Sequence, residues 1–389
     1  MSLRVRSVLP GWPLMNRNTL RFAAMLACAV AGCPAETPEA GSNAAAVGGI
    51  PPASPAPDSL KRIMILINGD SPFWDACRVG VKDAQRDFKL EESGFRAVVA
   101  ENDGTPQGQL EKLRQFANQV DIAAIGVSAI DANNVAIADE MRKLQQHGVK
   151  VVTIDSDLDR DKLRDARFAF IGTDNQLGGR ELGICAKNIR PGGGGYVTFV
   201  GRTGAQNAIE RVGGFADGAG EKFVSLDNMG DDTDRTRARD NVRNAIRNQG
   251  DKLNTLVGIW SYNAPAIVDV VQELQVRDKT TVVVFDAEPL AITHMEGGQI
   301  DAMIVQNPYQ MGYQGVRLMK ALIDDDQPVV RKMFPTLGEP DGDLYDTGLK
   351  VVVPADDSPL KPDMFGKKTE FLTLETFKQW LNKYDLKGS

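Results

Sequence analysis

Between residues 61 and 305 the chain alternates short apolar runs with longer segments whose apolar positions recur at helical spacing. The run Ile63–Ile67 is continuously apolar, which is typical of a strand buried on both faces, and helical spacing follows over residues 73–88. Further strands are expected at 97–100, 122–127, 151–154, 168–171, 196–200, 223–226, 255–259, 281–285 and 302–305. Helices fit at 207–222, 235–248, 264–276 and 309–323.

Alternation of strand and helix over about 250 residues predicts parallel sheets with helices on both faces. Ten or so strands are too many for one compact open sheet, and the series divides near Thr173–Asn175. The predicted fold class is therefore α/β, with two doubly wound parallel-sheet lobes. Residues 373–385 have apolar side chains at helical spacing and predict an amphipathic helix docked on the body, with no functional signal.

The first sixty residues have the pattern of a targeting segment followed by a linker. Arg17 and Arg21 precede ten apolar or small residues, and Gly32-Cys33 follows, so residues 1–32 are interpreted as a secretory signal. The end of this segment resembles a bacterial lipobox, which makes Cys33 the expected lipidation site; a plain signal peptide with a coincidental cysteine is the alternative. Residues 33–60 are rich in Pro and Ala and read as a flexible tether.

Charge excludes one class of partner. The chain has 389 residues with 45 Lys+Arg and 52 Asp+Glu, and without residues 1–32 its net charge is −11. Because neutralising phosphates takes clustered Lys and Arg, we expect no nucleic acid partner. No apolar run reaches the ~20 residues needed to span a bilayer, which argues against an integral membrane protein.

Cysteine and histidine are too few for a His/Cys metal centre, since the chain has two His and four Cys. After processing, Cys77 and Cys185 would remain in the folded body. They lie far apart on expected helices, so buried small hydrophobic side chains are favoured over a disulfide, which stays open. No metal ion and no cofactor is expected.

Polar and aromatic residues follow the expected strands directly. Open parallel sheets bind ligands beyond the carboxyl ends of their strands, so these positions are the informative ones. They are Asn68–Trp74, Ser128, Asp155-Ser156, Gly201-Arg202, Trp260–Asn263, Asp286 and Gln306–Pro308, with Arg211 just inside a helix. Carboxylates, amides and flat rings together suit a neutral polyol, because they pair with hydroxyl groups and with the C–H faces of a sugar.

The sequence lacks the common motifs of phosphate binding and of nucleophilic catalysis. No G-x-G-x-x-G follows the first strand, no P-loop motif occurs, and Gly192–Gly195 precedes a strand, as a helix-ending turn would. His294 falls in an expected helix without a second His or Cys nearby, and no Ser-His or Cys-His pair is evident. The chain is therefore not expected to be an enzyme.

Seven short motifs occur in the order of a known family across residues 61–354. They are Ser71–Trp74, Thr153–Asp155, Gly172–Gly179, Glu210–Phe215, Asp234-Arg235, Val284–Asp286 and Gln306–Gly312. On these motifs the region resembles the periplasmic sugar-binding proteins of bacterial ABC transporters, in particular the ribose-binding group, which shares its fold with the ligand domains of lac-repressor-type regulators. A secretory signal stands where such a regulator would have its DNA-binding helices.

The resemblance implies a type I periplasmic binding protein, with two lobes joined by three crossovers that close over a sugar. Its N-terminal lobe would be 61–173 plus 306–330, its C-terminal lobe 174–305 plus 331–354, and 355–389 a C-terminal extension. Thr173 and Gln306 would lie at hinge crossovers. The resemblance assigns ligand contacts to Ser71, Phe73, Trp74, Ser128, Asp155, Arg211, Tyr262, Phe285, Asp286 and Gln306, with stacking by Phe73 and Trp74 on one sugar face and by Phe285 on the other.

Four positions depart from the ribose-binding pattern, so the resemblance implies a sugar without specifying ribose. Ser128 and Tyr262 stand where the ribose binder has asparagines, Ser156 where it has an arginine and Thr233 where it has an aromatic residue. The expected function is capture of a monosaccharide, a pentose such as ribose or xylose or a related sugar, by a monomeric, lipid-anchored protein of the periplasm or cell envelope that delivers it to an ABC permease. A sugar sensor for a receptor and a secreted sugar-acting enzyme are the alternatives.

Each assigned residue also has a purely structural interpretation. Phe285 could be core, Phe73 and Trp74 the first apolar turn of a helix, and Arg211 a solvated helix residue. Asp155 and Asp286 are harder to explain structurally, because a carboxylate that ends a buried apolar strand is costly unless it has a partner or a ligand.

Overall fold

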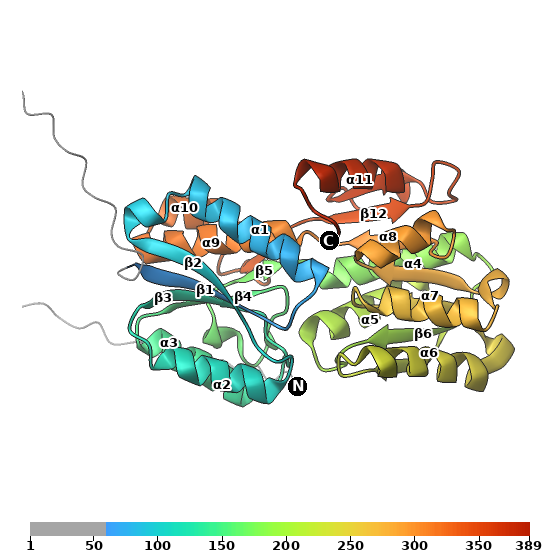
Figure 1. Cartoon of the computed structure of the whole chain (residues 1–389), viewed down its shortest axis with the longest axis horizontal. Coiled ribbons are helices and arrows are strands. Elements are labelled where there is room, and N and C mark those ends of the chain that lie inside the picture. Colours follow the sequence, from blue (N-terminus) through green and yellow to red (C-terminus); the bar gives the residue numbers. More distant parts are fainter. Residues whose placement is uncertain (1–59) are drawn as a thin grey trace, which may run out of the picture. The chain divides into compact units, whose positions relative to one another are not determined.

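The structure is a computed structural model that describes residues 60–389, so the expected signal peptide, Cys33 and nearly all of the tether lie outside the described residues. Two sheets organise the described part, each flanked by helices (Figure 1). No helix among these residues is long and apolar enough to cross a bilayer.

The first sheet has the strand order β11-β5-β4-β3-β1-β2, and all of its pairs are parallel. Its strands are β1 (Lys61–Ile67), β2 (Phe95–Glu101), β3 (Ile122–Val127), β4 (Lys150–Ile154), β5 (Phe170–Gly172) and β11 (Leu344–Asp346). The helices of this lobe are α1 (Pro72–Asp87), α2 (Pro106–Ala117), α3 (Val135–Gln146), α9 (Pro308–Asp324) and α10 (Gln327–Met333).

The second sheet has the order β13-β12-β10-β9-β8-β6-β7 and is parallel except for the pair of β10 and β12. Its strands are β6 (Gly194–Val200), β7 (Phe223–Gly230), β8 (Leu253–Gly258), β9 (Thr281–Phe285), β10 (Ala302–Val305), β12 (Leu349–Val353) and β13 (Thr369–Thr373). Its helices are α4 (Asn175–Ile189), α5 (Gln206–Ala219), α6 (Arg235–Gln249), α7 (Asn263–Glu273), α8 (Pro289–Glu296) and α11 (Leu374–Lys383). Short 3₁₀ turns lie at Glu91–Ser93, Arg164–Ala166, Gly250–Lys252, Arg277–Lys279 and Pro362–Met364.

Strand β1 is apolar without interruption because helices cover both of its faces. Successive side chains of a strand point to opposite faces. Ile63, Ile65 and Ile67 pack with α1 and α9 on one face, and Met64 and Leu66 pack with α2 and α3 on the other. The helix pairs lie on opposite sides of the first sheet (Figure 1). The prediction of two doubly wound α/β lobes is confirmed.

The strands near the C-terminal end of the chain differ from the expectation. Strands β11, β12 and β13 are absent from the predicted series. Residues 331–354 were assigned to the C-terminal lobe, but β11 pairs with β5 at the edge of the first sheet. Three residues with one clearly apolar side chain give no periodic signal, so this pairing depends on tertiary contacts. The extension 355–389 contains β13, which adds a strand to the second sheet beside β12.

Three crossovers connect the two lobes. They lie between β5 and α4, between β10 and α9, and between β11 and β12. Thr173 lies in the first and Gln306 in the second, and the Thr173 hydroxyl donates a hydrogen bond to Gln306 Oε1 over 2.9 Å. In the third, Thr347 donates from its amide and its hydroxyl to the Gly172 carbonyl, over 2.7 and 3.0 Å. The crossovers are thus bonded to one another.

Candidate functional site

A cavity of about 140 Å³ lies between the two lobes, lined by residues of both. In each sheet the first five strands of the lobe lie in the order second, first, third, fourth, fifth. The order changes direction between the first and third strands, and open parallel sheets have a ligand-binding crevice at that point. Loops after β1 and β3 line the cavity from one lobe, and loops after β6 and β8 from the other. An engineered cavity of about 150 Å³ accepts benzene, so this volume suits one small ring.

Asp155 directly follows β4 and is 7% exposed. Its φ of +65° is in the left-handed region, which Asp tolerates better than most residues. The Ser128 hydroxyl donates to Asp155 Oδ2 over 2.9 Å. Burial raises the pKa of Asp155 to about 6, although Arg211 and the Ser128 hydrogen bond act in the opposite direction.

Asp286 directly follows β9, also has a φ of +65°, and is 2% exposed. Gln306 Nε2 donates to both of its carboxylate oxygens, over 3.0 and 3.2 Å. Burial raises the pKa of Asp286 to about 6; Arg211 and Gln306 counteract this, and the charge of Asp155 adds to it. Both carboxylates are therefore buried, and for each the effect of burial on the pKa outweighs the opposing effects of Arg211 and of the hydrogen-bond donor.

Arg211 is a buried cation of this site and is 1% exposed. Its Nε donates to Asn175 Oδ1 over 2.9 Å and its Nη1 to the Ile259 carbonyl over 3.0 Å. The guanidinium carbon lies 4.3 Å from the centroid of the Phe285 ring. Its Nη2 is buried without a hydrogen-bond partner, and Arg211 lines the cavity. An unpaired buried donor is costly, so this nitrogen is suited to a ligand acceptor.

Close packing of α4 against α5 positions Arg211 and Asn175. A Cβ on Gly179 would lie 2.2 Å from the Arg211 carbonyl oxygen, and one on Gly214 would lie 2.3 Å from the Gln176 carbonyl oxygen. Both distances are too short for any side chain, so glycine at these two positions allows the helices to approach. Asn175 at the start of α4 can then accept the hydrogen bond from Arg211.

Aromatic side chains line the cavity from both lobes. Phe73 and Trp74, in the first turn of α1, are buried and meet edge to face with ring centroids 5.0 Å apart. From the second lobe come Trp260, whose Nε1 donates to Asn207 Oδ1 over 3.2 Å, and Tyr262, whose hydroxyl bonds to Asp231. Rings on two sides of a small polar cavity provide flat apolar surfaces for the C–H faces of a ligand.

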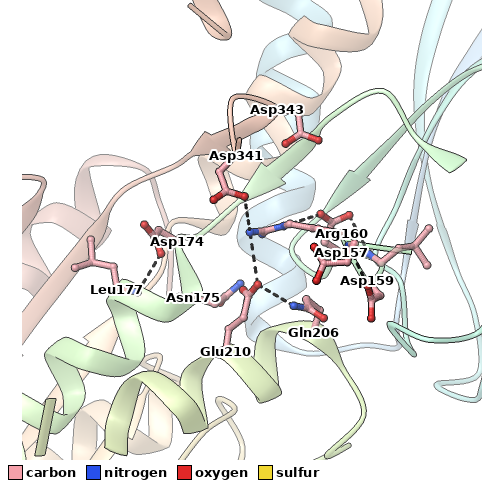
Figure 2. Close-up of polar contacts among 12 residues, drawn as sticks. Asp157, Asp159, Arg160, Asp174, Asn175, Leu177, Gln206, Glu210, Asp341 and Asp343 are labelled. Carbon is pink, nitrogen blue, oxygen red and sulfur yellow. Dashed lines mark hydrogen bonds and ion pairs between the residues drawn. The ribbon is translucent and has the colours of Figure 1, made fainter. Parts of the chain in front are cut away.

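The two lobes contact each other directly near the cavity. Arg160, in the loop after β4, places its Nη1 3.5 Å from Glu210 Oε1 on α5. Figure 2 shows Arg160 between Asp157 and Glu210, and its Nε donates to Asp157 Oδ2 over 3.2 Å. Gln206 Nε2 donates to the same Glu210 oxygen over 2.9 Å. Burial raises the pKa of Glu210, and Arg160 counteracts that rise.

Two further hydrogen bonds join the lobes. Arg202 Nη2 donates to the Gly104 carbonyl over 2.6 Å, and the Ala132 amide donates to the Gly204 carbonyl over 3.2 Å. Arg202 follows β6 and Gly104 follows β2, and both residues line the cavity. The arrangement is therefore a closed one, with the lobes in contact across the cavity.

The structure brings eight of the ten expected site residues to the cavity lining: Ser71, Phe73, Trp74, Asp155, Arg211, Tyr262, Asp286 and Gln306. Two lie behind it. Ser128 is buried, donates to Asp155 and accepts from Asn68 Nδ2 over 3.0 Å. Phe285, expected to stack on a sugar face, is fully buried in the core of the second lobe beneath Arg211. Both therefore act on the cavity through a neighbour.

Eleven lining residues were outside the ten, and four of them have large polar or aromatic side chains: Asn68, Arg202, Asn207 and Trp260. Asn68 and Arg202 lie in the loops after their strands, and Trp260 lies close behind β8, so the strand-end rule contained their signal. Asn207 is in the first turn of α5 and has no such signal; its role is visible only through its bond to Trp260.

The two cysteines of the described residues are not paired. Cys77 and Cys185 are free and buried, and burial raises the pKa of both thiols, in agreement with their interpretation as small hydrophobic residues. Within residues 60–389 no set of three or more His, Cys, Asp or Glu side chains is grouped to hold a metal ion.

Comparison with known proteins finds relatives that match about two thirds or more of this chain. The ribose import binding protein of Salmonella typhimurium is 25% identical over 287 residues, a match covering 72% of this chain and 89% of that protein. The D-allose-binding periplasmic protein of Escherichia coli is 24% identical over 267 residues, covering 66% of this chain and 82% of that protein.

Solved structures share the fold. An ABC transporter solute-binding protein from Burkholderia graminis, crystallised with D-arabinose, has a TM-score of 0.64 at 23% identity and covers 77% of this chain and 97% of its own. A glucose-galactose binding protein from Geobacillus stearothermophilus has a TM-score of 0.65 at 21% identity, covering 77% of this chain and 99% of its own. The periplasmic binding protein domain matches residues 63–327, more than half of the sequence. With its two doubly wound lobes and three crossovers, the chain belongs to the periplasmic binding protein family, with the type I fold.

Proposed function

We propose that this protein is an extracytoplasmic solute-binding protein that captures one monosaccharide between its lobes and delivers it to an ABC permease. The observation that carries the proposal is the grouping of Asp155, Asp286 and Arg211 at a one-ring cavity between the lobes. The carboxylates accept hydrogen bonds from hydroxyl groups, and Arg211 Nη2 donates to a hydroxyl or ring oxygen. Relatives named for ribose and D-allose support a sugar of this size.

No bond is made or broken in this function. Ligand contacts from both lobes stabilise the closed arrangement relative to an open one, and the ligand shifts that equilibrium by its difference in affinity for the two states. Trp74 and Asp155 contribute from the first lobe, and Arg211, Trp260 and Asp286 from the second. The sugar is therefore returned unchanged when the protein is denatured.

A thermal-shift screen tests the proposal. The panel contains D-ribose, D-xylose, D-arabinose, D-allose, D-galactose and D-glucose, with polyols and nucleosides for comparison. A ligand at 100 times its Kd stabilises the native state by about 2.7 kcal/mol, which raises Tm by several degrees in a protein of this size. If no sugar raises Tm while a compound of another class does, the monosaccharide assignment is wrong. Recovery of a chemically altered sugar would indicate an enzyme.

Cell-envelope attachment through Cys33 belongs to the same proposal, on the strength of the lipobox-like residues and the Pro-rich segment that follows. Cys33→Ala should move the processed protein from the detergent phase to the aqueous phase. Wild type that partitions into the aqueous phase would contradict lipidation. Cross-linking in cells separates the two partner classes, since a transport protein captures a permease and a sensory component captures a receptor.

A further inference from the structure

The last sixteen residues lie against both lobes at the crossovers. Phe377 and Leu381 of α11 are buried in the apolar cluster of the second lobe. The ring of Tyr384 lies 4.9 Å from the ring of Tyr309, in the first turn of α9, a helix of the first lobe. The Tyr309 hydroxyl donates to Asp83 Oδ2 on α1 over 3.0 Å. Figure 1 shows α11 above β12 and marks the end of the chain near α9 and α8.

Ser389 bonds to the backbone of the second lobe and of a crossover. The Ala287 amide donates to the Ser389 carbonyl over 2.7 Å, and the Ser389 amide donates to the Ala287 carbonyl over 3.1 Å. The Ser389 hydroxyl donates to the Gln306 carbonyl over 3.0 Å. Ser389 is 1% exposed, and Leu386 is also buried. A reciprocal pair of backbone bonds and a third bond from the side chain hold this segment in place.

These bonds end directly behind the cavity. Ala287 is the residue after Asp286, and Gln306 is both a cavity residue and a crossover residue. The Gln306 side chain in turn donates to the Asp286 carboxylate. A Cβ on Gly388 would lie 2.6 Å from the Ala287 carbonyl oxygen, so glycine at this position allows the close approach.

We propose that residues 384–389 form a hinge brace that positions Asp286 and Gln306 for the ligand and favours the closed arrangement of the lobes. Hinge motion is absorbed by a few crossover residues whose backbone angles change. The Ser389 hydroxyl ties one such residue, Gln306, to the second lobe, and Tyr384 adds a contact with the first. Rotation of the lobes would have to loosen these contacts. The effect on affinity rests on the proposed function; the effect on the hinge does not.

The experiment compares variants of the brace with matched controls in the full chain. Ser389→Ala removes one hydrogen bond, and Gly388→Ala places a methyl group against the Ala287 carbonyl. Lys387→Ala is the control in the same segment, because its side chain is exposed. Leu374→Ala is the stability control, because Leu374 is buried at the other end of α11. The readouts are amide exchange at Ala287, small-angle scattering of the sugar-free protein, Tm, and calorimetry with D-ribose, D-allose and D-arabinose.

We expect Gly388→Ala to accelerate exchange of the Ala287 amide at least tenfold and to shift the sugar-free scattering profile toward a larger radius of gyration. Ser389→Ala should weaken binding of whichever probe sugar wild type binds by about two- to tenfold, the worth of one neutral hydrogen bond. The Tm of Ser389→Ala should fall less than the Tm of Leu374→Ala. The sugar affinity of Leu374→Ala should equal that of wild type.

The brace is refuted if Gly388→Ala and Ser389→Ala match Lys387→Ala in exchange and scattering. It is also refuted if Leu374→Ala loses as much affinity as Ser389→Ala, because the effect would then be general destabilisation. If wild type binds none of the three sugars, exchange and scattering still decide the brace, and the failure belongs to the proposed function.

Discussion

Asp155 and Asp286 occupy equivalent positions in the two lobes. Each follows the fourth strand of its own lobe, β4 or β9, and each has a φ of +65°. The Asp155 amide donates to the Ile171 carbonyl on β5 over 3.1 Å, and the Asp286 amide donates to the Ile304 carbonyl on β10 over 2.8 Å. The same local geometry therefore presents one carboxylate to the cavity from each lobe, and a ligand between them has an anionic acceptor on either side.

Replacing one of these carboxylates should separate binding from folding. Asp286→Asn keeps the size of the side chain but removes the charge. Hydrogen bonds to a charged acceptor contribute about 1.5–3 kcal/mol and neutral ones about 0.5–1.5, so we expect sugar affinity to fall on the order of 10- to 100-fold. Tm of the sugar-free variant at pH 7 should be unchanged or higher, because the cost of a buried charge is removed. Calorimetry and thermal melts on one preparation measure both. Early melting with normal affinity would remove Asp286 from the site.

The raised pKa values predict opposite effects of pH on folding and on binding. With pKa values of about 6 in the folded protein, Asp155 and Asp286 bind more protons than in the unfolded chain between their ordinary pKa of 3.8 and about 6. Their contribution to the free energy of unfolding therefore rises as pH falls from 7 to 4. Sugar affinity should fall below about pH 6, by up to tenfold per pH unit for each proton taken up, because the charged form accepts the hydroxyl hydrogen bonds.

Differences between wild type and Asp286→Asn isolate this pH effect from that of other titrating groups. Melts and calorimetry from pH 4.5 to 8 should show that the variant loses part of both slopes. Identical pH profiles for the two proteins would contradict a titrating carboxylate at this position.

Trp74 and Trp260 should report ligand binding, since both line the cavity. Trp74→Ala should weaken sugar binding by about 1–3 kcal/mol, the scale for losing a large apolar contact. The fluorescence change on adding sugar should persist in Trp380→Phe, because Trp380 stacks on Phe377 in α11, away from the cavity. It should be greatly reduced when Trp74 and Trp260 are both changed to Phe. Unchanged affinity in Trp74→Ala would leave this residue a structural part of α1.

The ion pair of Arg160 and Glu210 joins the lobes and should stabilise the closed arrangement (Figure 2). Both side chains are mostly but not fully buried, so we expect Arg160→Ala to reduce sugar affinity by about two- to fivefold, with a smaller difference at high salt. Arg142→Ala is the control, because Arg142 pairs with Asp139 and Asp165 within the first lobe. Equal losses of affinity in the two variants would show that the interlobe pair has no special role.

The pattern of apolar and polar residues along the chain predicted most of the strands and helices. The unbroken run Ile63–Ile67 predicted a doubly covered strand because both of its faces pack against helices. Asp155 and Asp286 stood out for the related reason that a carboxylate at the end of such a strand needs a partner or a ligand. The burial of a strand on both faces and the position of a carboxylate at its end can both be inferred from adjacent residues in the sequence, and the structure shows both features.

Other features depend on which distant segments meet. Whether Phe285 faces a ligand or lies beneath Arg211 depends on how α5 packs across α4, through the contacts of Gly179 and Gly214. The Ser128 hydroxyl donates a hydrogen bond to Asp155 and does not face the cavity. This contact also depends on tertiary structure, because the two residues follow different strands.

The sequence by itself determined the two α/β lobes and the strand ends at which polar side chains collect, because hydrophobic periodicity encodes burial one element at a time. Tertiary structure alone decided the partner of β11, the contact between Arg160 and Glu210, and the return of Ser389 to Gln306. Each of these joins segments with little or no periodic signal of their own. Their positions follow from the packing of the whole chain, in which hydrogen bonds and ion pairs form between residues that the sequence holds far apart.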